Sequence, residues 1–186
     1  MRNRGDAHPF QHGTADWRKQ QLPCLGDAAA ESGKLDEAVA FYRRCYPSVL
    51  RVRDLLQAGA IGRLRRLAIN DEFPLSHRLD LIHFLAGPQA ALAQRDADLP
   101  AGSHAARGRI LTLTAASGAV STLNVGWSER SLVETIRLEG DAGSIHVDDL
   151  KAGRVRVERD GRSEAEAVGG LPWTHWGLIE DFVRHL

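Results

Sequence analysis

Two residues near the middle of the chain have the types and the spacing of an acid–base pair. His77 and Asp80 lie three positions apart in a segment with a helical pattern of apolar residues, so both side chains would project from one face of a short helix. Histidine exchanges protons near neutral pH, and the oxidation of an alcohol needs a group that takes the hydroxyl proton. The structural alternative is a histidine at the helix start and an aspartate stabilised by the helix dipole.

Three further residues have side chains suited to holding a small polar molecule. Arg43 and Arg44 precede Pro47 at a turn, where a guanidinium could donate several hydrogen bonds to a substrate hydroxyl or carboxylate. The alternative is an exposed basic pair at the approach to a helix. Trp127 ends a strand pattern and could stack on the face of a sugar, or it could pack in the core.

A metal site is not favoured by the spacing of the histidines and cysteines. His83 lies six positions after His77, which turns it away from His77 on a helix. Cys24 and Cys45 are 21 positions apart without a C-x-x-C pair, so we expect neither a zinc site nor a disulfide framework, and predict that both are reduced.

The elements that must position these residues predict an α+β fold. The sequence predicts a predominantly antiparallel β-sheet over about 63–168 with helices packed on one face, because at least five strand patterns follow one another through short turns. The helices are expected at 47–59, 76–86, where Ser76 would be the cap, and 176–186, and the strands at 63–73, 109–116, 119–128, 132–139, 144–147 and 154–159. Residues 96–108 are expected to form a polar loop.

Composition bounds the partners and the domain organisation. The 186 residues contain 24 Lys+Arg and 24 Asp+Glu, so no net field attracts nucleic acid or an anionic membrane. No apolar run approaches the roughly 18 residues of a membrane span, and we predict a cytoplasmic protein. We expect residues 1–26 to be loosely ordered and residues 27–186 to form one α+β domain for substrate binding and oligomerisation, with a truncated C-terminal helix.

Several segments, in order, resemble the C-terminal domain of the Gfo/Idh/MocA family of oxidoreductases. The resemblance covers about residues 30–186, and its strength lies in the order and spacing of the pieces. They are RR with a proline at 43–47, LLQAGAIG at 55–62, HRLDL with a leucine and glycine at 77–87, SGA at 117–119 with Trp127, ETIRLEG at 134–140, GSI at 143–145 and IEDFV at 179–183.

The resemblance implies an NAD(P)-dependent oxidoreductase acting on a sugar, polyol or related hydroxy compound. In the family an N-terminal Rossmann domain holds the cofactor, a Glu-Lys-Pro turn supplies a lysine, and an Asp-x-x-x-His pair faces the substrate. It implies a catalytic role for His77 with Asp80, and substrate contacts for Arg43, Arg44 and Trp127.

This sequence departs from the family pattern at three points. No G-x-G-x-x-G loop and no Glu-Lys-Pro occurs, and Phe73 stands where the aspartate four positions before His77 would be. We therefore expect NAD or NADP only if a Rossmann half is supplied, and no cofactor on the isolated chain. Whether the chain is itself an enzyme stays open.

Two interpretations of the function follow. The first is the substrate-binding and oligomerisation half of an oxidoreductase, truncated or split from its Rossmann-domain partner, and homo-oligomeric through the face of a sheet whose strands alternate Leu and Thr. The alternative is a catalytically inactive domain that binds a sugar-like ligand or dimerises. Residues 29–42 also resemble one tetratricopeptide unit, but such units need about three copies to bury their faces.

Overall fold

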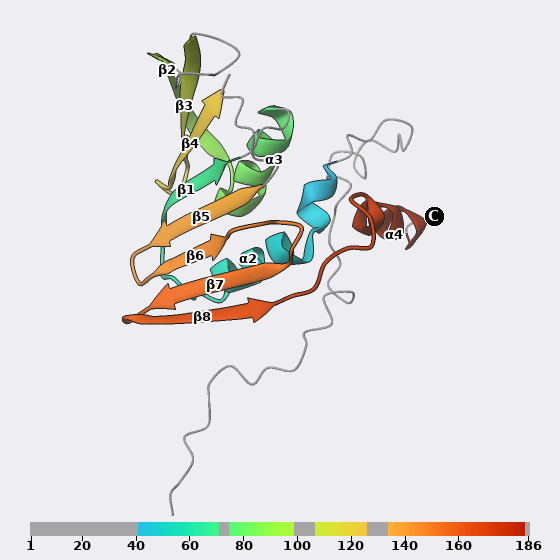
Figure 1. Ribbon diagram of the computed structural model, residues 1–186. Coiled ribbons are helices and arrows are strands. Elements are labelled where there is room, and N and C mark those ends of the chain that lie inside the picture. The colour runs from blue at the N-terminus through green and yellow to red at the C-terminus, as the bar shows by residue number, and fades with distance from the viewer. Residues whose placement is uncertain (1–40, 71–74, 99–106, 126–133, 185–186) are drawn as a thin grey trace, which may run out of the picture.

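The central element of the fold is an eight-stranded sheet (Figure 1). The computed structural model describes residues 41–70, 75–98, 107–125 and 134–184. The helical elements in chain order are η2 (Tyr42–Cys45, a 3-10 helix), α2 (Pro47–Gln57), α3 (Leu75–Ala86) and α4 (Trp176–Arg184). The strands are β1 (Leu64–Asn70), β2 (Gln89–Asp98), β3 (Arg107–Ala115), β4 (Val120–Val125), β5 (Thr135–Gly140), β6 (Ser144–Val147), β7 (Arg154–Arg159) and β8 (Arg162–Ala167).

The sheet has the strand order β2-β3-β4-β1-β5-β6-β7-β8. Strand β1 pairs in parallel with β4, and every other neighbouring pair is antiparallel. The one parallel pair arises because α3 and the β2–β3 hairpin intervene between β1 and β4, which gives the chain the length that a crossover needs. The predicted α+β class with a predominantly antiparallel sheet is confirmed.

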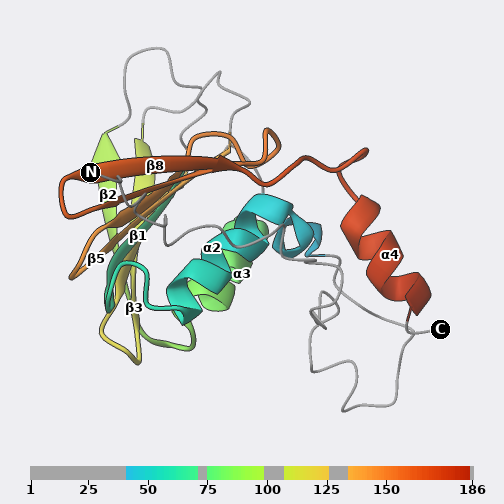
Figure 2. The ribbon, with the colours of Figure 1, turned by 90° about the horizontal axis from the view of Figure 1, so that it is seen from below.

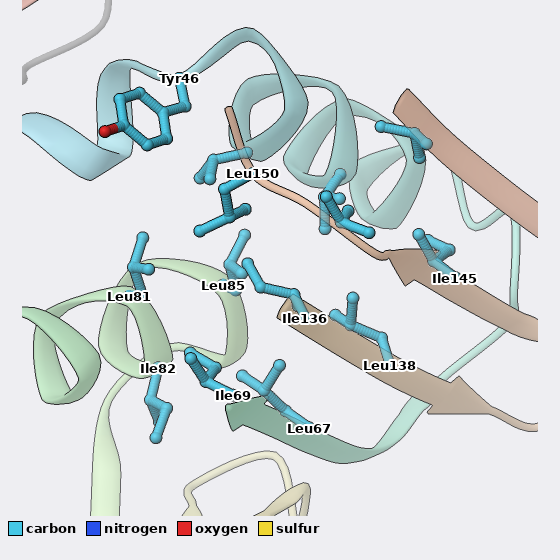
Figure 3. Packing of buried hydrophobic residues seen from close by; sticks show 14 of the residues in the cluster. Tyr46, Leu67, Ile69, Leu81, Ile82, Leu85, Ile136, Leu138, Ile145 and Leu150 are labelled. Carbon is cyan, nitrogen blue, oxygen red and sulfur yellow. The ribbon is translucent and has the colours of Figure 1, made fainter. Parts of the chain in front are cut away.

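Helices α2 and α3 lie side by side on one face of the sheet (Figure 2). Alternate strand residues point toward them, as the two-residue period of a strand requires. In Figure 3, Leu67 and Ile69 of β1 and Ile136 and Leu138 of β5 point toward the helices. Helix α3 contributes Leu81, Ile82 and Leu85, and these buried side chains form one core with those of the strands. Helix α2 begins at Pro47, whose fixed φ and missing N–H suit the first turn.

The other face of the sheet is open to solvent and mixed in chemistry. Its exposed side chains include charged, hydroxyl and small apolar groups, and they line a shallow depression of about 370 Å³. Exposed members are Arg66, Ala68, Val120, Thr122, Arg137 and Glu139. The leucines that alternate with these residues are buried on the helix side, so the open face is less apolar than the alternation of Leu and Thr predicted.

Two edge strands were not predicted. Strand β2 lies in a stretch for which no strand was predicted, and only its residues 96–98 fall in the expected 96–108 loop. Its Gln/Ala/Asp composition has no strand signal, and the strand is held by its pairing with β3. Strand β8 is exposed throughout and pairs with β7 across the Asp160-Gly161 turn. Both turn residues have positive φ, 53° and 70°, as a two-residue hairpin turn of this kind requires.

Helix α4 is placed differently from the prediction. It was expected to cover the sheet, but it packs on η2 at the end of the molecule (Figure 1). Gly177 permits this contact, since a Cβ there would lie 2.7 Å from the Cβ of Cys45. The apolar side of α4, with Ile179, Phe182 and Val183, is left exposed. Helix α3 begins at Leu75, so Ser76 lies in its first turn and is not its cap.

The prediction that both cysteines are reduced is wrong, because Cys45 is disulfide-bonded. Cys24 lies outside the described residues. Disulfides are more common in oxidising compartments than in the cytoplasm, so the predicted location stays a prediction. None of the helices in the described ranges has the length and apolar character to cross a bilayer.

Candidate functional site

A buried ion pair fixes η2 to the sheet. The Arg43 side chain is 1% exposed, and its Nε and Nη2 atoms donate to Oε1 of Glu134 at 3.1 and 2.5 Å. Glu134 is equally buried and immediately precedes β5, and its backbone oxygen accepts a 2.9 Å hydrogen bond from the Leu150 N–H. Arg43 therefore joins η2 to Glu134, which lies 91 positions later in the chain, and the ion pair is buried.

A second arginine of η2 binds α3. The Arg44 guanidinium donates to both carboxylate oxygens of Asp80, with an Nε to Oδ2 distance of 2.8 Å. Such a two-point pairing fixes orientation as well as distance. Asp80 is 8% exposed, so its carboxylate is held by Arg44 on the buried side of α3. The structure brings Asp80 together with Arg44 and not, as predicted, with His77 in a cleft-facing pair.

His77 lies in a row of aromatic rings. Its imidazole is half-buried and makes edge contacts with the rings of Tyr42 and Phe41, at centroid distances of 5.1 and 5.9 Å. Tyr42 makes a further edge contact with His175, at 4.3 Å. His175 comes from the turn before α4, so three segments distant in sequence meet here. Within the described ranges, the buried Nδ1 atom of His77 has no hydrogen-bond partner.

The environment of His77 keeps its imidazole neutral near pH 7. Partial burial lowers the pKa of His77 below its ordinary value, because the charged form loses hydration. The nearby Arg43 guanidinium lowers this pKa further, while Asp80 and Glu134 oppose the shift and His175 adds to it. A neutral imidazole is a proton acceptor, which is the state that a general base requires.

Sequence reasoning missed three residues of this site. Glu134 begins one segment that carries the family resemblance and Tyr42 adjoins another, yet neither has a local signal for its long-range contact. His175 lies between Trp173 and Trp176, where a row of large aromatics was the only available signal. Trp127 and Phe73 lie outside the described residues.

The described residues contain no cluster of metal ligands, and the sequence contains no dinucleotide-binding loop. In the part of the chain that the structure describes, no three His, Cys, Asp or Glu side chains gather as metal ligands would. The sequence contains no G-x-G-x-x-G loop, whose backbone amides would hold a pyrophosphate at a helix N-terminus. That the isolated chain binds no nicotinamide dinucleotide stays a prediction from the sequence.

Comparison by sequence gives no match to a family model and none to a curated protein. Comparison by structure gives many matches to oxidoreductases. An NAD-binding oxidoreductase from Klebsiella pneumoniae has a TM-score of 0.62 at 16% identity, over 82% of this chain and 57% of that one. Levoglucosan dehydrogenase in complex with NADH and levoglucosan has a TM-score of 0.60 at 18% identity, over 76% and 54%.

A third structure is an oxidoreductase from Agrobacterium radiobacter, in complex with NAD+, L-tartaric acid and magnesium. Its TM-score is 0.58 at 17% identity, over 77% of this chain and 51% of that one. The chain thus spans about half the length of the structures that it matches. At these identities the likeness shows the fold, and the fold agrees with the resemblance found in the sequence.

We predict that His77 titrates below 6.5, the ordinary value of a histidine. Between the lowered pKa of His77 and 6.5, the unfolded chain binds more protons than the folded one. The contribution of His77 to the free energy of unfolding is therefore complete above pH 6.5 and is lost as the pH falls from 6.5 through the lowered pKa. NMR titration of the histidine ring protons measures the pKa, with His77→Gln identifying the resonance. The variant should also lose stability less steeply than the parent on acidification. A His77 pKa at or above 6.5 contradicts the prediction.

Proposed function

We propose that this chain is the substrate-binding and oligomerisation half of an NAD(P)-dependent oxidoreductase of the Gfo/Idh/MocA type. The substrate is a sugar, polyol or related hydroxy compound. The observation that carries the proposal is the neutral His77 in its aromatic row, on a fold shared with NAD-binding oxidoreductases. Two of those structures contain levoglucosan and L-sorbose, which are hydroxyl-rich molecules.

The step assigned to this chain is a proton transfer. The neutral His77 imidazole accepts the proton of the substrate hydroxyl that is being oxidised. NAD or NADP would accept the hydride, and it would enter with a separate nucleotide-binding half because this chain has no loop to hold it. In the family pattern a carboxylate orients the histidine, whereas here Phe73 stands at that position, so we expect modest turnover.

The two arginines have different parts in the proposal. Arg43 is a positioning residue, because its charge is buried against Glu134. It acts on His77 only electrostatically, by lowering the pKa of the imidazole. The Arg44 side chain is 16% exposed, so it retains an edge for a substrate hydroxyl while Asp80 holds it in place. Asp80 acts through Arg44, and Trp127 remains a substrate-contact prediction from the sequence.

The exposed apolar side of α4 is the surface on which we expect a nucleotide-binding half to pack. Ile179, Phe182 and Val183 are exposed on a helix whose buried side carries Gly177 and Asp181. An exposed apolar stripe of this kind marks an interaction surface. Because the chain spans about half of the matching oxidoreductases, we assign this surface to the half that it does not contain.

An inactive sugar-binding or dimerisation domain is the second candidate. It is favoured by the absence of a cofactor loop and of a Glu-Lys-Pro turn from the sequence. The two candidates differ in turnover once a nucleotide-binding half is present, and they share the ligand class.

We predict that the chain forms a dimer or a larger homo-oligomer through the open sheet face. Thr122 is exposed on that face, so Thr122→Glu should shift the assembly toward monomer by placing like charges opposite one another. Light scattering across a concentration series measures the assembly. Ile179→Glu on α4 is the control and should leave it unchanged. A parent chain that is monomeric throughout the series, or equal effects of the two substitutions, contradicts the assignment.

We predict dehydrogenase turnover when a related Rossmann half is fused to residues from about Gly33 onward. In the fusion, His77→Ala should lower kcat by at least about a hundredfold, the usual contribution of a general base. His83→Ala is the matched control, because His83 is an exposed histidine on the same helix. Reduction of NAD or NADP with a panel of sugars and polyols gives the readout. Turnover that His77→Ala leaves unchanged rules out the catalytic assignment, and a folded fusion without turnover favours the inactive binding domain.

A further inference from the structure

A partly open cavity lies beside the aromatic row. Its volume is about 480 Å³, and it is lined by the start of α2, the turn after β6 and the segment that leads into α4. Its volume falls within the roughly 300–1,000 Å³ of small-molecule sites. The residues that line the cavity include Tyr46, Lys151, Trp173, Thr174 and His175. None of them was predicted as a site residue.

Trp173 forms an aromatic wall at the mouth of this cavity. Its side chain is 66% exposed, although hydration of so large an apolar surface is unfavourable. The Trp176 ring lies behind it, with a centroid distance of 5.2 Å and an interplanar angle of 54°. This contact covers part of the indole and leaves the rest exposed. An exposed indole offers a flat apolar face that can receive the C–H face of a sugar ring.

The remaining lining groups suit hydroxyls. Tyr46 is buried at 2% exposure; its Oη atom has no hydrogen bond of normal geometry and lies near the Thr174 side chain. Burial raises the pKa of Tyr46, so the phenol stays protonated and can donate. Thr174 and His175 add groups that donate and accept, and Lys151 adds a donor. None of the described residues that line the cavity is an aspartate or a glutamate.

The cavity is connected to the candidate base through one ring. His175 lines the cavity and contacts Tyr42 at 4.3 Å, and Tyr42 contacts His77 at 5.1 Å. A molecule that occupies the cavity therefore lies beside the row that contains His77.

We propose that this cavity binds the ring form of a sugar, stacked on Trp173 and hydrogen-bonded by the polar groups that line the cavity. The choice of a sugar rests on the proposed function, and it narrows the substrate class from hydroxy compounds in general to cyclic ones. An acyclic polyol has the same hydroxyls but no flat C–H face, so it cannot use the indole in this way. Binding does not require the cofactor or turnover.

Fluorine NMR of the chain labelled with 5-fluorotryptophan tests the proposal directly. The sequence has four tryptophans, so the label gives four resonances, and Trp173→Phe identifies the one of interest. We would titrate the chain with methyl glucoside, methyl galactoside and methyl xyloside, and with the acyclic sorbitol and galactitol. At least one glycoside should shift the Trp173 resonance saturably, whereas the two acyclic polyols should not.

Substitutions separate stacking from other effects on binding. Because both Trp173 variants lack the labelled indole, calorimetric titration measures their dissociation constants. Trp173→Ala should raise the dissociation constant of the bound glycoside about tenfold or more, whereas Trp173→Phe should retain part of the affinity because a smaller flat ring remains. Leu92→Ala removes an exposed side chain from the distant edge strand β2 and should leave binding unchanged. Proton spectra of each variant report whether it is folded.

The outcomes distinguish this inference from the proposed function. The inference is overturned if no glycoside shifts the Trp173 resonance saturably, or if glycosides and acyclic polyols shift it equally. Glycoside binding without turnover in the fusion supports the cavity and removes the enzyme assignment. If the fusion turns over a cyclic sugar and Trp173→Ala leaves its rate and its KM unchanged, the enzyme assignment stands. The sugar then binds outside this cavity, and the inference is overturned.

Discussion

The buried ion pair between Arg43 and Glu134 is the constraint on which the rest of the structure depends. Removing two charges from water is costly, and the cost is met only when each charge keeps its partner. The pair therefore ties η2 to the start of β5 with little freedom. From this anchored turn, Arg44 binds Asp80 of α3, and Pro47 begins α2. Cys45 of the same turn contacts α4 at Gly177. Four residues thus join the sheet to all three helices.

The same turn links the architecture to the chemistry of the candidate site. Arg43 helps to lower the pKa of His77, so the charge that anchors η2 also favours the neutral base. Tyr42, the preceding residue, separates His77 from His175 and extends the site toward the Trp173 cavity. Structural support and electrostatic tuning come from adjacent residues of one turn, so a change in either should alter the other.

The sequence predicted the elements with local signals and missed those that depend on distant partners. Pro47 and the glycines of the turns placed α2, the β3–β4 hairpin and the β5–β6–β7 meander within a few residues. Strand β2 has no strand composition and forms only because β3 offers an edge, and α4 was drawn to η2 by a close Gly177 contact that hydrophobic periodicity does not encode. The partners of Arg43 and Arg44 lie 91 and 36 positions away, and nothing near either arginine identifies them. His77 was found because histidine chemistry and the family resemblance coincide there.

Equilibrium unfolding of Glu134→Gln tests most directly whether this ion pair organises the protein. The substitution keeps the shape of the side chain but leaves Arg43 as a buried charge without its counterion, so the account predicts a loss of about 3–5 kcal/mol in the free energy of unfolding. The His77 pKa should fall further in the same variant, because Glu134 is one of the groups that raise it. Asp141→Asn, which breaks the exposed pair with Arg65, is the control and should cost far less. Equal stability of Glu134→Gln and Asp141→Asn, with an unchanged His77 pKa, would contradict the account.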